Sequence, residues 1–157
     1  MPAKNSPKTK TRKATYADAD LTLKLYDLRR ESEMRKARNY MVMQFNPQSA
    51  AEALAIVQGF GSQENAWLRQ VLGYWDMAAA MVNLGVLHPD LFYASTGEAY
   101  LLFAKFDPHL AEIRRAIESP GFMAELEKAV NCTQKGRERL ALMRKRILQR
   151  RAAAAAK

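Results

Sequence analysis

Residues 62–85 read SQENAWLRQVLGYWDMAAAMVNLG, and this stretch decides the fold class. Its apolar side chains recur at intervals of three and four residues, the pattern of a helix that buries one broad face. The residues that follow this spacing are Trp67, Val71, Leu72, Trp75, Ala78, Ala79 and Val82. Ser62 can cap the free backbone N–H groups at the start, and Gly85 favours termination. The stretch predicts a long helix from Ser62 to about Leu84.

The chain from Tyr16 onward has the same helical character. Leu, Ala, Met, Glu, Lys and Arg dominate, and the apolar–polar alternation typical of strands is absent from the sequence. Proline stands at three expected helix starts, which are His88-Pro89, Asp107-Pro108 and Ser119-Pro120. We therefore predict an all-α fold, a single bundle of about seven or eight helices, two of them long.

Two further helices are expected before the decisive stretch. The first should begin after Asp18 or Asp20 and continue to about Gln44, because apolar spacing persists along it. The segment Asn46-Pro47 should end it, since the residue before a proline avoids helical geometry. A short second helix should then begin at Pro47, with Asn46 as its cap, and reach about Gln58.

The positive charge is concentrated at the two ends of the chain, although the formal net charge is +9 overall. Residues 1–14 contain five basic residues and no acidic one, and residues 135–157 contain nine basic residues against Glu138. The first residues also have too few apolar side chains to offset the entropy lost on ordering. We expect a disordered basic arm at 1–15, an all-α globular domain at 16–134 and a basic amphipathic C-terminal helix at 135–157.

Composition also excludes several classes of protein. With the single cysteine Cys132, an intramolecular disulfide and a multi-cysteine zinc site are impossible, and a reducing compartment fits best. Only His88 and His109 are available as imidazole ligands, so no metal site and no cofactor are expected. No apolar run approaches the roughly 20 residues of a transmembrane helix. We expect a cytoplasmic protein without a transmembrane segment.

Several features of residues 20–130 resemble a family of small bacterial all-α domains of unknown function. The similar features are Trp75-Asp76 within an apolar helix, Asn83-Leu84-Gly85-Val86-Leu87, Pro89-Asp90-Leu91-Phe92, the aromatic helix with Tyr100, Phe103 and Phe106, and the segment Met34–Arg38. The resemblance implies an all-α fold. It implies no activity and no site residue.

Asp76 is the most informative polar residue, because it lies on a helix that should be mostly buried. An unpaired buried carboxylate is unfavourable and should either neutralise or find a cation. The helix that contains residues 29–38 supplies candidates, and we expect Asp76 to pair with Arg35 or Arg38 as a structural ion pair. The alternative is that Asp76 faces solvent. The mixed charges of residues 29–38 themselves indicate either a solvated helix face or an anion site.

The C-terminal segment gives the strongest functional signal. Leu140, Met143 and Ile147, with Leu148, form an apolar stripe at helical spacing. The cations around it, which are the candidate polyanion contacts, are Arg137, Arg139, Arg144, Lys145, Arg146, Arg150 and Arg151. Such a basic amphipathic helix can dock its stripe on the domain, bind nucleic acid through phosphates, or lie on an anionic membrane or in a partner groove.

No catalytic residues can be assembled from the sequence, since no nucleophile, base and orienting group fall together. We therefore expect a non-catalytic helical interaction module whose basic tails contact nucleic acid or another polyanion. One alternative is a helical scaffold that associates with itself or with a protein partner. A small apolar-ligand pocket among the aromatic and methionine residues, or an enzyme, is the third alternative.

Overall fold

The computed structural model describes residues 12–156, and its elements are all helical within them. They are α1 (Tyr16–Leu28), α2 (Ser32–Asn39), the π-helical turn η1 (Tyr40–Gln44), α3 (Ala50–Val57), α4 (Gln63–Asn83), α5 (Pro89–Ser95), α6 (Gly97–Phe106), the 3-10 turn η2 (Asp107–His109), α7 (Leu110–Ala116), α8 (Ala124–Asn131) and α9 (Gln134–Ala155). The all-α prediction is confirmed, and the two longest helices are α4 and α9.

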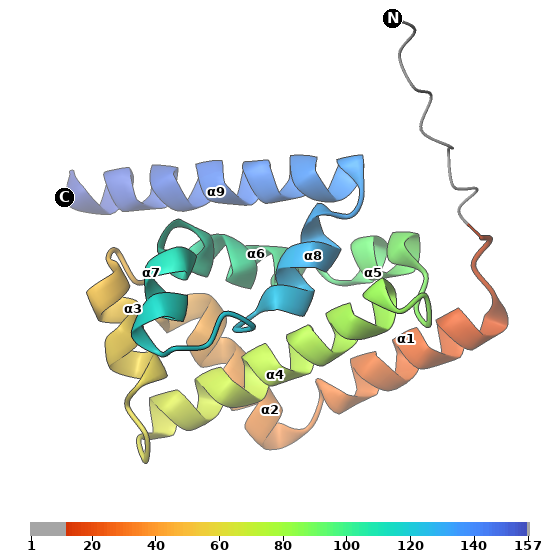
Figure 1. Cartoon of the computed structure of the whole chain (residues 1–157), viewed down its shortest axis with the longest axis horizontal. Helices are drawn as coiled ribbons and strands as arrows, with labels where there is room; N and C mark the ends of the chain where they lie inside the picture. The colour runs from red at the N-terminus through yellow and green to blue at the C-terminus, as the bar shows by residue number, and fades with distance from the viewer. Residues whose placement is uncertain (1–11, 157) are drawn as a thin grey trace, which may run out of the picture.

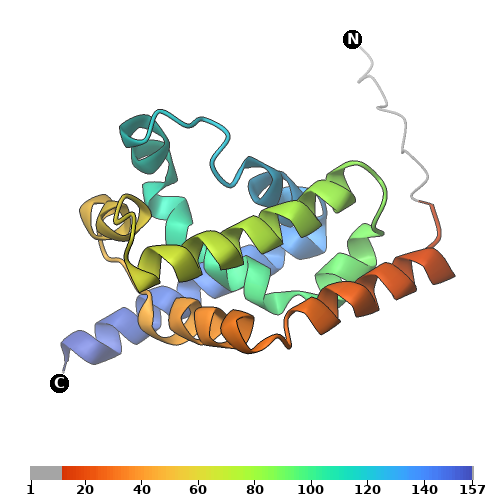
Figure 2. The same ribbon diagram turned by 90° about the horizontal axis from the view of Figure 1, so that it is seen from below.

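Helix α6 occupies the middle of the molecule. Both views place it between α4 on one side and α9 on the other (Figures 1 and 2). Seven of its ten residues are buried, including Tyr100, Phe103 and Phe106. A helix that is apolar around most of its circumference is expected in the interior of a bundle. The decisive stretch itself, α4, buries one face and packs mainly along α2 and α8.

The ends of α4 form as the sequence predicts. Ser62 accepts a hydrogen bond from the backbone N–H of Asn65 at 3.1 Å. At the other end, Gly85 has a φ of 75°, a left-handed conformation that favours glycine over every residue with a side chain. The predicted start at Pro89 is also confirmed, with His88 as the cap of α5, and the Thr133 hydroxyl caps α9.

The expected first helix is divided in two, and that expectation was wrong. Helix α1 ends at Leu28 and α2 begins at Ser32, because the Glu31 carboxylate accepts hydrogen bonds from the N–H groups of Glu33 and Met34 and caps a new helix. The apolar pattern contains the signal. Leu25 and Met34 are both buried, yet nine residues of continuous helix would place them on opposite faces, roughly 180° apart.

Two other starts also differ from the sequence prediction. Helix α3 begins at Ala50 with Ser49 as its cap, so Asn46 and Pro47 lie in the connection before it. Helix α8 begins at Ala124, several residues after Pro120, because Met123 takes a left-handed backbone conformation with φ 57°. In both cases the proline lies in the connection between two elements and does not start the next helix.

The expected basic arm lies mostly outside the described residues, which begin at Arg12. Asp18 of α1 is buried, and both of its oxygens accept hydrogen bonds from the Arg12 guanidinium. The backbone N–H of His88 donates to the same carboxylate at 2.8 Å. These hydrogen bonds, those from Arg12 most of all, hold the pKa of Asp18 well below its usual range. The contacts fix the start of α1 against the connection between α4 and α5.

A buried lysine joins α6 to the end of η1. Lys105 is 4% exposed, and its ammonium group donates to the carbonyls of Met41 at 2.8 Å, Val42 at 2.8 Å and Phe45 at 2.6 Å. Carbonyls at the end of a helix have no partners within it and carry partial negative charge. Lys105 therefore serves as a buried cationic cap for this end.

Candidate functional site

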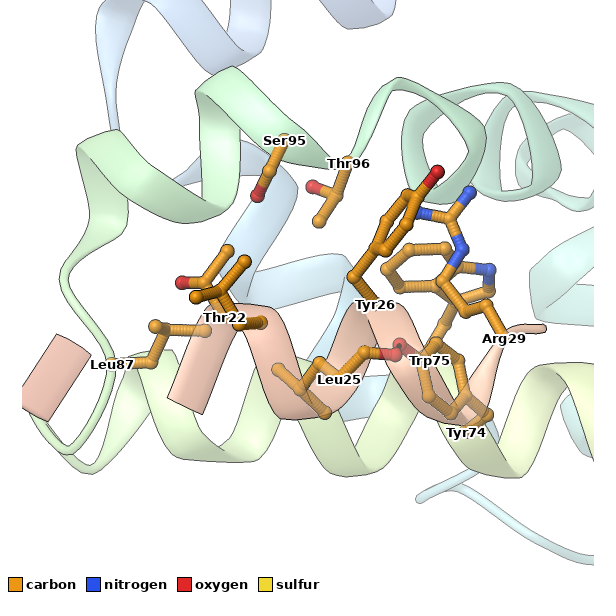
Figure 3. Close-up of a pocket in the computed structure, with 10 residues that line it drawn as sticks. Thr22, Leu25, Tyr26, Arg29, Tyr74, Trp75, Leu87, Ser95 and Thr96 are labelled. Atoms are coloured by element: carbon orange, nitrogen blue, oxygen red, sulfur yellow. Dashed lines mark hydrogen bonds between the residues drawn. The ribbon is translucent and has the colours of Figure 1, made fainter. Parts of the chain in front are cut away.

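A pocket of about 320 Å3 lies between α1, the middle of α4 and the end of α5. Figure 3 shows its lining side chains, which converge from these separate parts of the chain. They are Thr22, Leu23, Leu25, Tyr26 and Arg29 from α1 and its C-terminal cap, Tyr74 and Trp75 from α4, Leu87 from the next connection, and Ser95 and Thr96 from the end of α5. The surface is almost entirely apolar, with a single cationic side chain.

Arg29 is that cation, and the break between α1 and α2 turns it inward. Its guanidinium lies 5.0 Å from the centre of the Trp75 ring and 5.8 Å from that of Tyr26 (Figure 3). The Nε atom of Arg29 is buried and has no hydrogen-bond partner among residues 12–156. Stacking on two aromatic rings holds the side chain in place without satisfying its donors.

A carboxylate lies next to Arg29 but is engaged by another arginine. Glu98 of α6 accepts hydrogen bonds from Nε and Nη2 of Arg38, the shortest at 2.7 Å, and from the indole N–H of Trp75 at 3.1 Å. The distance from Arg29 Nη2 to Glu98 is 3.6 Å, which is too long for a good hydrogen bond. Two partly buried cations therefore face one carboxylate, and Arg29 is the cation in excess.

Four of the five hydroxyl groups that line the pocket donate to backbone carbonyls, and the fifth belongs to Tyr26, which is 57% exposed. Thr22 donates to Asp18 at 2.8 Å, Ser95 donates to Leu91 at 2.6 Å, and Thr96 donates to Phe92. The Tyr74 hydroxyl donates to the carbonyl of Leu25 at 2.6 Å. Burial, the main cause, raises the pKa of Tyr74 to about 12, so this hydroxyl stays protonated. These hydroxyls are therefore not free to donate to a ligand.

The structure does not bring Asp76 together with Arg35 or Arg38. Arg38 pairs with Glu98 instead, and Arg35 is exposed on α2. Asp76 accepts a hydrogen bond from the N–H of Leu126, in the first turn of α8, at 2.8 Å. The N-cap residue of α8 supplies no side-chain cap, so the carboxylate from α4 takes that role across the helix interface. Burial raises the pKa of Asp76.

Replacing Asp76 with alanine should lower the free energy of unfolding by about 1–2 kcal/mol, the usual contribution of a helix N-cap. Asp76→Asn keeps an oxygen acceptor and should retain more than half of that stability. Urea denaturation of the two variants and the wild type measures the difference. Equal stability of Asp76→Ala and wild type would show that the carboxylate does not support α8.

Helix α9 docks on the domain through its apolar stripe, which answers a question that the sequence left open. Leu140 and Ile147 are buried against the core, Met143 is partly buried, and Leu148 is 63% exposed. The helix lies along α6 and against α8 (Figure 1). The basic residues of α9 therefore have fixed positions on the surface of the molecule.

Four of the seven candidate polyanion contacts are engaged by the domain. Arg139 lies 3.6 Å from the centre of the Tyr93 ring, and Arg144 pairs with Asp107 at 2.6 Å. Arg137 and Arg151 donate to main-chain carbonyls, those of Asn131 and Pro47 respectively. The other three, Lys145, Arg146 and Arg150, are exposed, as is Lys135 in the first turn.

The remaining sequence candidates do not form a site. Within residues 12–156, no three His, Cys, Asp or Glu side chains come together as a metal centre requires. Cys132 is an exposed free thiol. In the same part of the chain, no helix is both long enough and apolar enough to cross a membrane.

The sequence alone does not reveal the pairing of Arg29, Trp75 and Glu98. Residues 29–38 form a mixed-charge run for which an anion site is one interpretation, but the carboxylate that pairs with Arg38 is some 60 residues further along the chain. Glu98 gives no local signal, because a glutamate in the first turn of a helix is ordinary. The out-of-phase apolar positions Leu25 and Met34 are the one signal that reveals the turn at Arg29.

Comparison with known proteins gives a family assignment for most of the chain. The family model described as a domain of unknown function, DUF4760, matches residues 14–132. No curated protein and no solved structure matches the chain. The matched residues include the whole pocket and end before α9 begins. The chain therefore belongs to the DUF4760 family, over a region that extends from the residue before the cap of α1 to the end of α8.

Proposed function

We propose that the protein is a non-catalytic, cytoplasmic interaction module whose basic C-terminal helix contacts nucleic acid or another polyanion. The observation that carries the proposal is the set of exposed cations Lys135, Lys145, Arg146 and Arg150 on a helix held in place by its apolar stripe. Fixed cations can face a row of phosphates without the entropy loss of ordering a free tail.

The dimensions of α9 suit such a partner. A helix of 22 residues is about 33 Å long, close to one turn of a DNA duplex. The exposed charged side chains of α9 are lysines and arginines except for Glu138, and the helix has no aromatic side chain for base stacking. Contacts to phosphates alone give weak sequence preference and strong dependence on salt. The basic residues near the N-terminus add to the same positive charge.

A charge-neutralising variant tests the proposal. Lys135, Lys145, Arg146 and Arg150 are changed together to glutamine, and binding to a labelled duplex of about 20 base pairs and to single-stranded RNA is measured by fluorescence anisotropy at low salt. We expect affinity to fall at least roughly tenfold, since several phosphate contacts are lost. The helix should remain docked, because its apolar stripe is unchanged.

A matched control separates a specific surface from total charge. The exposed cations Arg30, Arg69, Arg115 and Lys128 lie outside α9, and changing these four to glutamine removes the same charge. The control variant should bind within about threefold of wild type. Equal loss in both variants, or no binding of wild type to either nucleic acid at low salt, contradicts the assignment to α9.

A further inference from the structure

We infer that the pocket between α1, α4 and α5 binds a small apolar molecule that carries a single carboxylate, with the carboxylate held by Arg29. This site is separate from the basic surface of α9. It rests on the shape and chemistry of the pocket and on the unbalanced charge at one end of it, and does not depend on the proposed function.

The body of the ligand is indicated by the lining. The side chains of Leu25, Leu87, Tyr74 and Trp75 present hydrocarbon and ring surface, and every lining hydroxyl except that of the exposed Tyr26 donates to a backbone carbonyl. A volume of about 320 Å3 is at the lower end of the range of ligand pockets, roughly 300–1,000 Å3. A sugar or nucleotide needs several free donors and acceptors, so the lining favours an aliphatic or aromatic body.

The head of the ligand is indicated by Arg29. Arg38 donates hydrogen bonds to both oxygens of Glu98, while Arg29 lies 3.6 Å from the same carboxylate, so the two guanidinium groups and one carboxylate have one positive charge in excess. A partly buried guanidinium with an unused donor is stabilised by an anion that replaces its lost hydration. A bound ligand with one negative charge would balance this excess positive charge. A carboxylate is suited to the position because its two oxygens match the paired N–H groups of a guanidinium.

The pocket also has an apolar rim through which such a molecule could enter. Leu23 and Tyr26 line the pocket from α1, and they remain 68% and 57% exposed. An occupant that covers these two side chains removes apolar surface from water, which favours binding. The rim, the lining and the cation therefore select for the same amphipathic molecule.

Calorimetric titration with three probes tests the inference on the wild-type chain. Octanoate supplies both the apolar body and the carboxylate, octanamide supplies the body alone, and acetate supplies the head alone. We expect octanoate to bind roughly tenfold to a hundredfold more tightly than octanamide, and acetate to show no binding, because one charge-assisted contact adds to the apolar term. Equal affinities for octanoate and octanamide, or no octanoate binding at millimolar concentration, overturn the inference.

Variants then locate the site. Arg29→Met should reduce octanoate affinity to that of octanamide, whereas Arg30→Met, one residue along and exposed, should leave it unchanged. Thr22→Phe fills the pocket and should abolish binding of both probes. In a Trp67→Phe background, Trp75 is the only tryptophan, so its fluorescence should change on octanoate binding. Equal binding by Arg29→Met and Arg30→Met contradicts the site; if Arg29→Met does not fold, the probe comparison on wild type decides.

Discussion

Replacing Lys105 with methionine should lower the free energy of unfolding by about 3 kcal/mol at neutral pH. The side chains have similar length, but methionine leaves the carbonyls of Met41, Val42 and Phe45 without the buried donor that they share. Unsatisfied buried acceptors are unfavourable by about 1–3 kcal/mol each, and removal of the buried charge offsets only part of that loss. Denaturant unfolding measures the difference. Lys128→Met, on the exposed face of α8, should change stability by less than about 0.5 kcal/mol.

The difference in stability between wild type and Lys105→Met should depend on pH. Burial, with the nearby charges of Arg150 and Arg151, lowers the pKa of Lys105 to about 8. The pKa of an unfolded lysine is about 10.4, so between these values the unfolded chain binds more protons than the native one. The free energy of unfolding of the wild type should therefore rise with pH over this interval. Its difference from that of Lys105→Met should increase. A difference that is constant from pH 7.5 to 10 would show that the ammonium is not buried.

Replacing Glu98 with alanine is the second change with a large expected effect, about 3 kcal/mol of lost stability. Glu98 is 11% exposed and balances the charge of Arg38 while accepting from the Trp75 indole. Its removal leaves two partly buried guanidinium groups without a carboxylate, a situation that is strongly unfavourable. Thermal unfolding followed by circular dichroism measures the loss. Glu112→Ala, on an exposed position of α7, should leave the midpoint unchanged within about 2 °C.

Double-mutant cycles measure how much of the stability lost in Glu98→Ala comes from its interaction with Arg38 and how much from its interaction with Arg29. The coupling between Glu98 and Arg38 should be about 2 kcal/mol, because they share short hydrogen bonds. The coupling between Glu98 and Arg29 should be under about 1 kcal/mol, since their closest N–O distance is 3.6 Å. Equal couplings would mean that Glu98 neutralises both cations, which removes the reason for an anion at Arg29.

Local signals in the sequence were sufficient for the fold class and for several helix ends. Ser62, Gly85 and Pro89 act through their own backbone geometry and hydrogen bonds, so their effects can be predicted without knowledge of the rest of the fold. The division of the first helix could not be predicted from glycine or proline, because neither occurs there. A glutamate, Glu31, caps α2 instead, and glutamate is not among the preferred cap residues.

The partners of charged residues depend on how the helices are rotated, which one sequence does not determine. Asp76 and Arg38 both lie on helices that pack together, yet they face different neighbours, Leu126 and Glu98. The same reason explains Lys105, whose three acceptors lie about 60 residues away along the chain. A lysine within an aromatic helix is equally compatible with a surface position until the central place of α6 is known.

For α9, the apolar spacing of Leu140 and Ile147 correctly identified the buried face. The sequence could not distinguish the cations that the domain engages from those without such a partner among residues 12–156, because Asp107 and the carbonyl of Pro47 lie in other segments. Fewer cations are therefore available to a polyanion than the total positive charge of residues 135–157 suggests. The candidate surface consists of Lys145, Arg146 and Arg150, with Lys135 near the start of the helix.

The salt dependence of nucleic-acid binding tests the role of α9 most directly. Each phosphate contact contributes about 0.9 to the magnitude of the slope of log affinity against log salt concentration on duplex DNA. Compared with wild type, the slope should therefore be about three to four smaller in magnitude for the variant in which four residues are changed to glutamine, Lys135, Lys145, Arg146 and Arg150. The control variant at Arg30, Arg69, Arg115 and Lys128 should keep the wild-type slope. Identical slopes for wild type and the α9 variant would contradict a polyanion-binding surface on this helix.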